Sequence, residues 1–191
     1  KKEQFDRGFS LNKTLRELET CGKPVAVALN GLALGGGLEV ALACHYRVAA
    51  NDNPKLQFGL PEAKIGLLPG AGGTQRLPRL IPAADAVRMI TGGKPVNANA
   101  ALSLGLIDRI GDSSDACAEG IAFARALIAA EKGPRPAASL PCNTLESADL
   151  AAFRAKTAKA ARGAVAPMAC LDAVEAAISL PFSEGLKKER A

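Results

Sequence analysis

The chain has 191 residues, of which 48% are hydrophobic and 23% charged, as expected of a globular protein with a buried core. Aromatic residues make up only 4% of the chain, with no Trp and one Tyr, which argues against a surface that stacks nucleobases. The formal net charge is +5 and the basic residues are scattered, apart from a cluster at 187–190 that we interpret as a solvated tail rather than a nucleic-acid site.

Short strands and helices are predicted to alternate in the first half of the chain. Apolar spacing over residues 10–20 indicates an amphipathic helix, and the valine-rich run at 25–29 indicates a buried strand. A glycine-rich segment at 30–37 leads into an apolar helix. Extended structure is expected at 45–50 and again at 55–58.

The second half of the chain is predicted to be mainly helical. Helices are expected at residues 83–91, 97–104, 113–131, 146–162 and 167–179. Glycines close the first two of these helices. Residues 106–110 indicate a short strand, and the proline-rich residues 133–141 indicate a linker.

Three consecutive glycines, at 35–37, precede the apolar helix that carries Glu39. A helix N-terminus presents free N–H groups and the positive end of the dipole, and a glycine loop lets a ligand oxygen approach them. If the helix begins near Gly36, one N–H and the carboxylate of Glu39 face a shared cavity, which pairs an oxyanion site with an acid or base. The alternatives are a purely structural glutamate in the first helical turn, or a phosphate loop without the P-loop lysine.

Glu62 follows Pro61, which is expected in the first position of a short helical turn. A structural role is open here too, as it is for the second glycine loop at 70–73, where Arg76 and Arg79 follow as expected surface residues. Two carboxylates in one apolar pocket would raise one pKa through burial and mutual repulsion. One group could then hold a proton while the other takes one from water, as hydration of a conjugated double bond requires.

Three segments in series resemble the crotonase superfamily: KPVAVALNGLALGGGLEVALAC at 23–44, LQFGLPEAKIGLLPGAGGTQRLPRLI at 56–81 and ALSLGLIDRI at 101–110. Their joint order favours a chemical reading of both glutamates over the structural one. The resemblance implies an α/β fold of repeated ββα units wound as a superhelix, and an acyl-CoA substrate.

The same resemblance implies a role for each predicted site residue. It places an oxyanion-hole N–H at Gly36, the two acid/base groups at Glu39 and Glu62, and an N–H that helps to hold the water at Gly70. His45 is the only histidine, and no residue lies at a spacing that would indicate a catalytic or metal-binding partner for it. It is therefore expected to be structural. No His, Cys and carboxylate cluster has metal-ligand spacing, so no metal is expected.

The resemblance also predicts how the chain is divided. A crotonase-like hydratase core, incomplete at its N-terminus, is expected at 1–131, a linker at 132–145 and a helical extension at 146–191. Residues 163–191 resemble the segment that leads to a 3-hydroxyacyl-CoA dehydrogenase region in multifunctional β-oxidation enzymes. No dinucleotide fingerprint occurs, so no NAD site is expected in this chain. The family's N-terminal segment and its second oxyanion donor are not in this sequence, so the chain alone is expected to be impaired or inactive.

The leading hypothesis is an enoyl-CoA hydratase that adds water to trans-2-enoyl-CoA in fatty acid β-oxidation. The alternatives are a Δ3-Δ2-enoyl-CoA isomerase, a non-catalytic acyl-CoA-binding or assembly module, and a nucleotide-phosphate binder. The five cysteines are odd in number and lack metal-ligand spacing, which indicates reduced thiols and a cytoplasmic protein. The expected partners are an acyl-CoA thioester and a homo-oligomer or β-oxidation complex, with no nucleic acid and no membrane.

Overall fold

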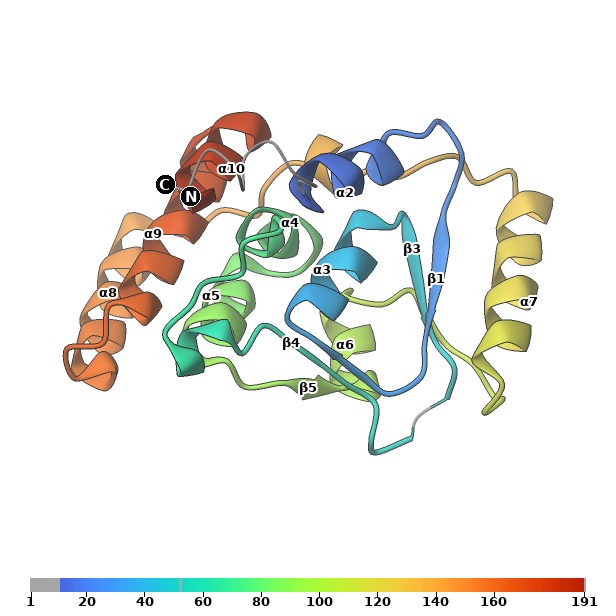
Figure 1. Cartoon of the computed structure of the whole chain (residues 1–191), viewed down its shortest axis with the longest axis horizontal. Coiled ribbons are helices and arrows are strands. Elements are labelled where there is room, and N and C mark those ends of the chain that lie inside the picture. Colours follow the sequence, from blue (N-terminus) through green and yellow to red (C-terminus); the bar gives the residue numbers. More distant parts are fainter. Residues whose placement is uncertain (1–10, 52, 191) are drawn as a thin grey trace, which may run out of the picture.

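A computed structural model describes residues 11–51 and 53–190 of the chain (Figure 1). The strands are β1 (Ala26–Leu29), β2 (Leu32–Leu34), β3 (Tyr46–Ala49), β4 (Gln57–Gly59), β5 (Val96–Asn97) and β6 (Arg109–Ile110). The helices of the N-terminal half are α2 (Leu11–Glu19), α3 (Gly36–Ala43), η1 (Glu62–Ile65), α4 (Gly73–Leu80) and α5 (Ala83–Gly92). They are followed by α6 (Ala98–Leu104), α7 (Ala116–Ala129), η2 (Ala137–Ser139), α8 (Ser147–Ala161), α9 (Ala166–Ser179) and α10 (Phe182–Arg190).

The strands form two small sheets, with the orders β1-β3-β6 and β2-β4-β5. The pairs β1–β3, β3–β6 and β2–β4 are parallel, and β4–β5 is antiparallel. The chain runs β1, β2, α3 and then β3, β4, η1, so each turn places its first strand in one sheet and its second strand in the other. This arrangement confirms the predicted α/β fold of repeated ββα units.

One apolar core joins the sheets to the helices on either side of them. Leu42 of α3, Phe58 of β4 and Ile90 of α5 are fully buried in it together with Leu171 and Val174 of α9. In Figure 1, helices α8, α9 and α10 lie at one end of the molecule, and α7 covers β1 at the other end. The C-terminal helices therefore bury part of the same core as the strands.

Most of the predicted elements are confirmed, with ends that differ by one to three residues from the expected ones. The predicted start of the first helix at residue 10, like residues 1–10 of the predicted core, lies outside the described residues. Pro61 precedes η1 as its N-cap instead of opening it. The strand expected at 106–110 is wrong over its first half, because Leu106 donates its N–H to Ala101 O in the turn that closes α6.

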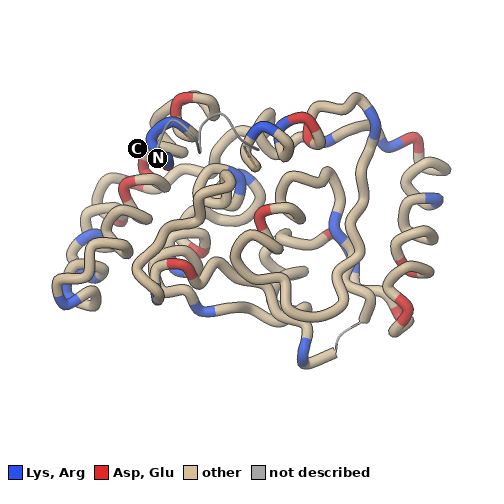
Figure 2. Tube along the Cα trace, viewed as in Figure 1, with Lys and Arg blue, Asp and Glu red and all other residues tan. Residues whose placement is uncertain are grey.

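Acidic and basic residues are interspersed over the elements of the described chain (Figure 2). No described helix has the length and apolar character needed to cross a membrane. The cluster at 187–190 is only partly the solvated tail that was predicted. Lys187 and Lys188 are exposed, but the side chain of Glu189 is buried.

The prediction that Arg76 and Arg79 are surface residues is wrong, since both are buried. Arg76 pairs with Glu19 at 3.0 Å, and Arg79 donates to the carbonyl of Ala177 at 3.2 Å. Both guanidinium groups also lie 5.2 Å from the centre of the Phe182 ring. These partners are distant in the sequence, so the residues next to Arg76 and Arg79 do not indicate them.

Arg47 fixes the C-terminal end of α3 from inside the core. It is fully buried and donates to Cys44 O at 2.7 Å, to Ala41 O at 3.3 Å and to Leu106 O at 2.7 Å. Burial lowers the pKa of Arg47 to about 10, and the nearby charge of Asp108 partly opposes this shift. A cation at the C-terminus of α3 complements the negative end of the helix dipole.

Replacement of Arg47 by Met is expected to lower the free energy of unfolding by about 3 kcal/mol, because three buried carbonyls lose their donor. Urea denaturation would measure the loss. The control is Arg88→Met, since Arg88 is largely exposed and its pair with Asp85 should contribute less than about 1 kcal/mol. Equal losses in the two variants would contradict the assigned role of Arg47.

Candidate active site

The glycine-rich loop ends at the first turn of α3, and Gly36 is the first helical residue, as predicted. Gly35 has φ +55°, a value that favours glycine, and donates its N–H to Gly59 O at 2.9 Å. Within the described part of the chain, the N–H of Gly36 has no hydrogen-bond acceptor, and this residue is exposed. The positive end of α3 is therefore open to a ligand oxygen.

Glu39 lies one turn into α3 and points its side chain into the protein. Only 3% of its surface is exposed, and its Oε1 accepts the N–H groups of Ala71 at 2.7 Å and Gly73 at 2.8 Å. Burial raises the pKa of Glu39, these two hydrogen bonds lower it, and the charge of Glu62 raises it again. The net shift is upward, so Glu39 binds a proton more readily than an exposed glutamate does.

Glu62 opens η1 and lies against the glycine-rich loop. A Cβ added to Gly35 would come within 2.9 Å of Glu62 Oε1, so the carboxylate lies beside the residue that precedes the open N–H of Gly36. Its other oxygen, Oε2, is buried and has no hydrogen-bond partner among residues 11–51 and 53–190. Burial raises the pKa of Glu62, and a hydrogen bond from its own backbone N–H only partly opposes this shift.

The second glycine loop carries the donors that hold Glu39. Gly70 is exposed at its start, and its carbonyl accepts the Asn12 side-chain amide at 2.9 Å. The N–H of the next residue, Ala71, donates the shorter of the two hydrogen bonds to Glu39. The structure thus brings all four predicted site residues into one region, with Gly70 beside Glu39 and Gly36 beside Glu62. The chemical role of each stays a prediction.

A buried ion pair that the sequence did not reveal supports this loop from behind. Arg76 donates to Ala71 O at 3.0 Å and pairs with Glu19, which also accepts the N–H of Ala138 at 2.8 Å. Burial opposes ionisation of Glu19, but the charge and hydrogen bonds of Arg76 lower its pKa overall. Arg76 therefore holds the carbonyl side of Ala71, the residue whose N–H donates to Glu39.

His45 has a structural role in this network, as expected. Its Nδ1 accepts the N–H of Val25 at 2.8 Å, so the proton is on Nε2, which lies 2.9 Å from Glu19 O. The imidazole is fully buried and occupied on both sides. Among the described residues, no group of His, Cys, Asp and Glu side chains is arranged as a metal site.

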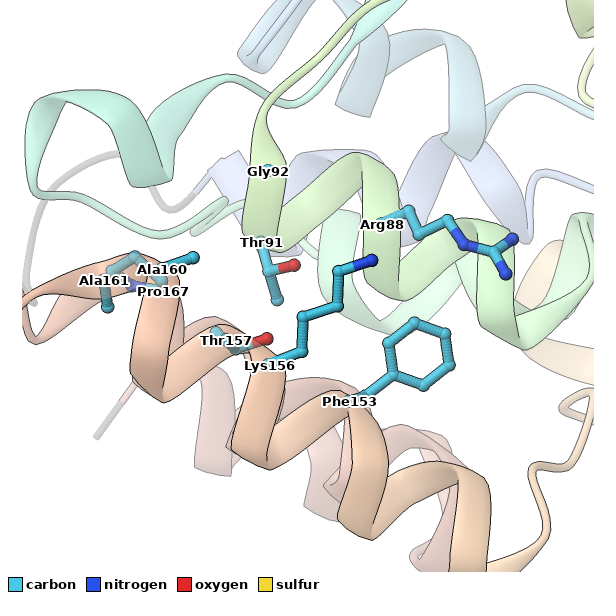
Figure 3. Close-up of a pocket in the computed structure, with 9 residues that line it drawn as sticks. All are labelled: Arg88, Thr91, Gly92, Phe153, Lys156, Thr157, Ala160, Ala161 and Pro167. Atoms are coloured by element: carbon cyan, nitrogen blue, oxygen red, sulfur yellow. The ribbon is translucent and has the colours of Figure 1, made fainter.

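A cavity of about 350 Å³ lies between α5 and α8, away from the two glycine loops (Figure 3). Lys156 and Phe153 extend from α8 toward Arg88 and Thr91 on α5. None of the four predicted site residues lines this cavity. It is therefore separate from the site that the sequence predicts.

Comparison with known proteins supports the fold described above. A family model described as enoyl-CoA hydratase/isomerase matches residues 1–159. The "Peroxisomal bifunctional enzyme" of Danio rerio is 43% identical over 185 residues, which cover 96% of this chain and 25% of that protein. The "Probable enoyl-CoA hydratase" of Bacillus subtilis is 47% identical over 137 residues, which cover 71% of this chain and 50% of that protein. A solved enoyl-CoA hydratase structure from Bacillus anthracis has a TM-score of 0.58 and 30% identity, over 94% of this chain and 56% of that one.

The two sheets and the repeated ββα order define a crotonase-like fold. The chain belongs to the enoyl-CoA hydratase/isomerase family, which confirms the resemblance found in the sequence. It spans about a quarter of the length of the bifunctional relatives that it matches.

The geometry at Glu39 predicts how stability depends on pH. The folded-state pKa of Glu39 is raised, so its contribution to stability is present at low pH and is lost as pH rises through that pKa. Glu39→Gln keeps an Oε1 acceptor for Ala71 and Gly73 and removes the buried charge. The free energy of unfolding of the variant should therefore rise relative to that of the wild type as pH increases.

Urea denaturation between about pH 4 and pH 8 would measure this difference. The control is Glu17→Gln, since Glu17 is exposed and pairs only with Lys13 at 3.9 Å. For the control, the difference from the wild type should stay nearly constant. A constant difference for Glu39→Gln as well would show that its carboxyl is not perturbed in this way.

Proposed function

We propose that this chain carries the catalytic groups of an enoyl-CoA hydratase, which adds water to trans-2-enoyl-CoA in fatty acid β-oxidation. The observation that carries the proposal is the placement of two carboxylates, the buried Glu39 and the half-buried Glu62 whose charge raises the pKa of Glu39, beside an open helix N-terminus. Family membership supports the same reaction class. The acyl-CoA thioester is the substrate, and we propose that no NAD site is present in this chain.

The two glutamates differ in their hydrogen bonds, which supports different roles for them. Glu39 accepts two N–H groups, which favour its charged form and suit a base that takes a proton from water. Glu62 has an oxygen without a donor and a raised pKa, which suits an acid that gives a proton to the α-carbon. The water oxygen bonds to the β-carbon, so the product gains one hydroxyl and one hydrogen.

Negative charge develops on the thioester oxygen as water adds. The N–H of Gly36 at the positive end of α3 would donate to this oxygen and stabilise the enolate. The N–H of Gly70 would hold the attacking water near Glu39, since Gly70 precedes Ala71 directly. Both roles are proposed from the position of the two peptide groups in the loops.

The isomerase alternative would use one glutamate to move a proton between two carbons. The hydrogen bonds that hold Glu39 favour the hydratase, because an isomerase has no need of a second ordered carboxylate. A non-catalytic acyl-CoA-binding or assembly module would tolerate loss of both carboxylates. We also propose the division into a core at 1–131, a linker at 132–145 and a helical extension at 146–191 that leads to a dehydrogenase region.

The full-length protein should hydrate a short trans-2-enoyl-CoA, seen as loss of the absorbance of the conjugated thioester. Glu39→Gln and Glu62→Gln should each lower kcat by about 10²-fold or more, because each removes an acid or base. Glu17→Gln should retain full activity, because Glu17 is exposed and its carboxylate pairs with the exposed Lys13. Conversion of a 3-enoyl-CoA without hydration would favour the isomerase, and full activity of both glutamine variants would leave only the binding module.

A second experiment tests the contact between Glu62 and the glycine-rich loop. Gly35→Ala and Gly22→Ala both introduce a side chain at positive φ, +55° and +77°. Each should cost about 1 kcal/mol of stability or more, and Gly35→Ala should cost more than Gly22→Ala because Gly35, with ψ −130°, lies outside the left-handed helical region. Only the Cβ at position 35 meets Glu62; the one at position 22 has nothing within 4 Å. Gly35→Ala should therefore lower kcat by about 10-fold or more, whereas Gly22→Ala should not. Equal activity of the two variants would contradict the proposed place of Glu62.

A further inference from the structure

Glu189 connects the last helix, α10, to the second glycine loop. Its side chain is 3% exposed, and its Oε1 accepts the N–H of Gly72 at 2.8 Å. Its Oε2 accepts the N–H of Thr74 at 3.2 Å and the hydroxyl of the same threonine at 2.5 Å. These contacts join residues more than a hundred positions apart in the chain, 117 for Gly72 and 115 for Thr74.

Two carboxylates thus share the N–H groups of one four-residue segment. Ala71 and Gly73 donate to Glu39, and Gly72 and Thr74 donate to Glu189. This alternation depends on Gly72, which has φ +92° and begins α4 as its N-cap. Each peptide group is planar, and neighbouring groups are joined at one Cα through φ and ψ. Contacts that hold the N–H groups of Gly72 and Thr74 therefore restrict the directions open to the N–H groups of Ala71 and Gly73 between and beside them.

Helix α10 is held in place by contacts other than those of Glu189. The Phe182 ring lies within 5.4 Å of the guanidinium groups of Arg16, Arg76 and Arg79. At Gly185 the helix approaches the Gln75 amide so closely that an added Cβ would lie 2.0 Å from its oxygen. Loss of the Glu189 carboxylate should therefore release the loop while α10 stays docked.

We infer that Glu189 is a positioning residue, which fixes residues 71–74 so that the N–H groups of Ala71 and Gly73 point at Glu39. The effect on catalysis rests on the proposed function, but the effect on the loop does not. The C-terminal helix α10 then contributes to the order of the site through one side chain. Glu189 itself acts through the loop and touches neither Gly36 nor Gly70.

The test compares Glu189→Gln with Glu184→Gln in the full-length protein. A glutamine at 189 has one oxygen, so its NH₂ group faces one of the two loop N–H donors and leaves it without an acceptor. Glu184 is on the same helix and is exposed, and among the residues that the structure describes its carboxylate accepts a hydrogen bond only from Lys187, at 2.8 Å, which makes it the matched control. Measurements at about pH 8 keep Glu189 ionised, because burial raises its pKa to about 7.

Amide hydrogen exchange reports on the loop without any assumption about the reaction. In Glu189→Gln, exchange at Ala71 and Gly73 should rise at least 10-fold, although neither amide touches Glu189, and exchange in the core strands should stay as in the control. Unchanged exchange at these two amides overturns the inference. Exchange that rises throughout the chain also overturns it, because Glu189 would then support the fold in general.

Steady-state kinetics then connects the loop to the chemistry. Glu189→Gln should lower kcat with enoyl-CoA about 10-fold while KM stays within about twofold, since Glu39 is misaligned and the substrate contacts remain. Equal kcat in Glu189→Gln and Glu184→Gln overturns the positioning role. If the wild type does not hydrate enoyl-CoA, the proposed function fails, and hydrogen exchange alone decides the inference.

Discussion

The structure around the site depends on the hydrogen bonds that stabilise one buried carboxylate, that of Glu39. A buried carboxylate is costly unless hydrogen-bond donors compensate the lost water, and here the donors are the N–H groups of Ala71 and Gly73. Those donors exist only because α4 begins in a glycine loop with free N–H groups at its first turn. The start of α4 and the first turn of α3 must therefore stay in register for the site to exist.

A chain of buried polar contacts maintains this register from the side opposite the open loops. His45 bonds to the carbonyl of Glu19, the Glu19 carboxylate pairs with Arg76, and Arg76 donates to the carbonyl of Ala71. Each group is buried, so loss of any one would leave a partner unsatisfied in a region without water. The network thus connects helix α2 and the start of β3 to Ala71 in the second glycine loop.

The sequence predicts the groups that act locally and fails for those with distant partners. The start of α3 at Gly36 and the turn at Glu62 follow from glycine, proline and apolar patterns within a few residues. The local pattern predicts a surface position for Arg76 and a solvated tail for Glu189, although both are buried and bond to the second glycine loop. Their partners lie 57 and 115 or more positions away, and a single sequence without its tertiary contacts contains no pattern for such pairs.

The same residue type acquires different properties at positions 39 and 62 because the surrounding peptide groups differ. Two N–H groups stabilise the negative charge of Glu39, whereas Glu62 has a buried oxygen that meets no donor within the described chain. Burial raises the pKa of both groups, although Glu39 is buried and Glu62 only half-buried. The hydrogen bonds of the second glycine loop offset this effect at Glu39 alone, and they thereby distinguish the two carboxylates, as the proposed acid and base roles require. In the proposed hydration, the loop rather than either glutamate alone would then decide which carboxylate takes the proton from water.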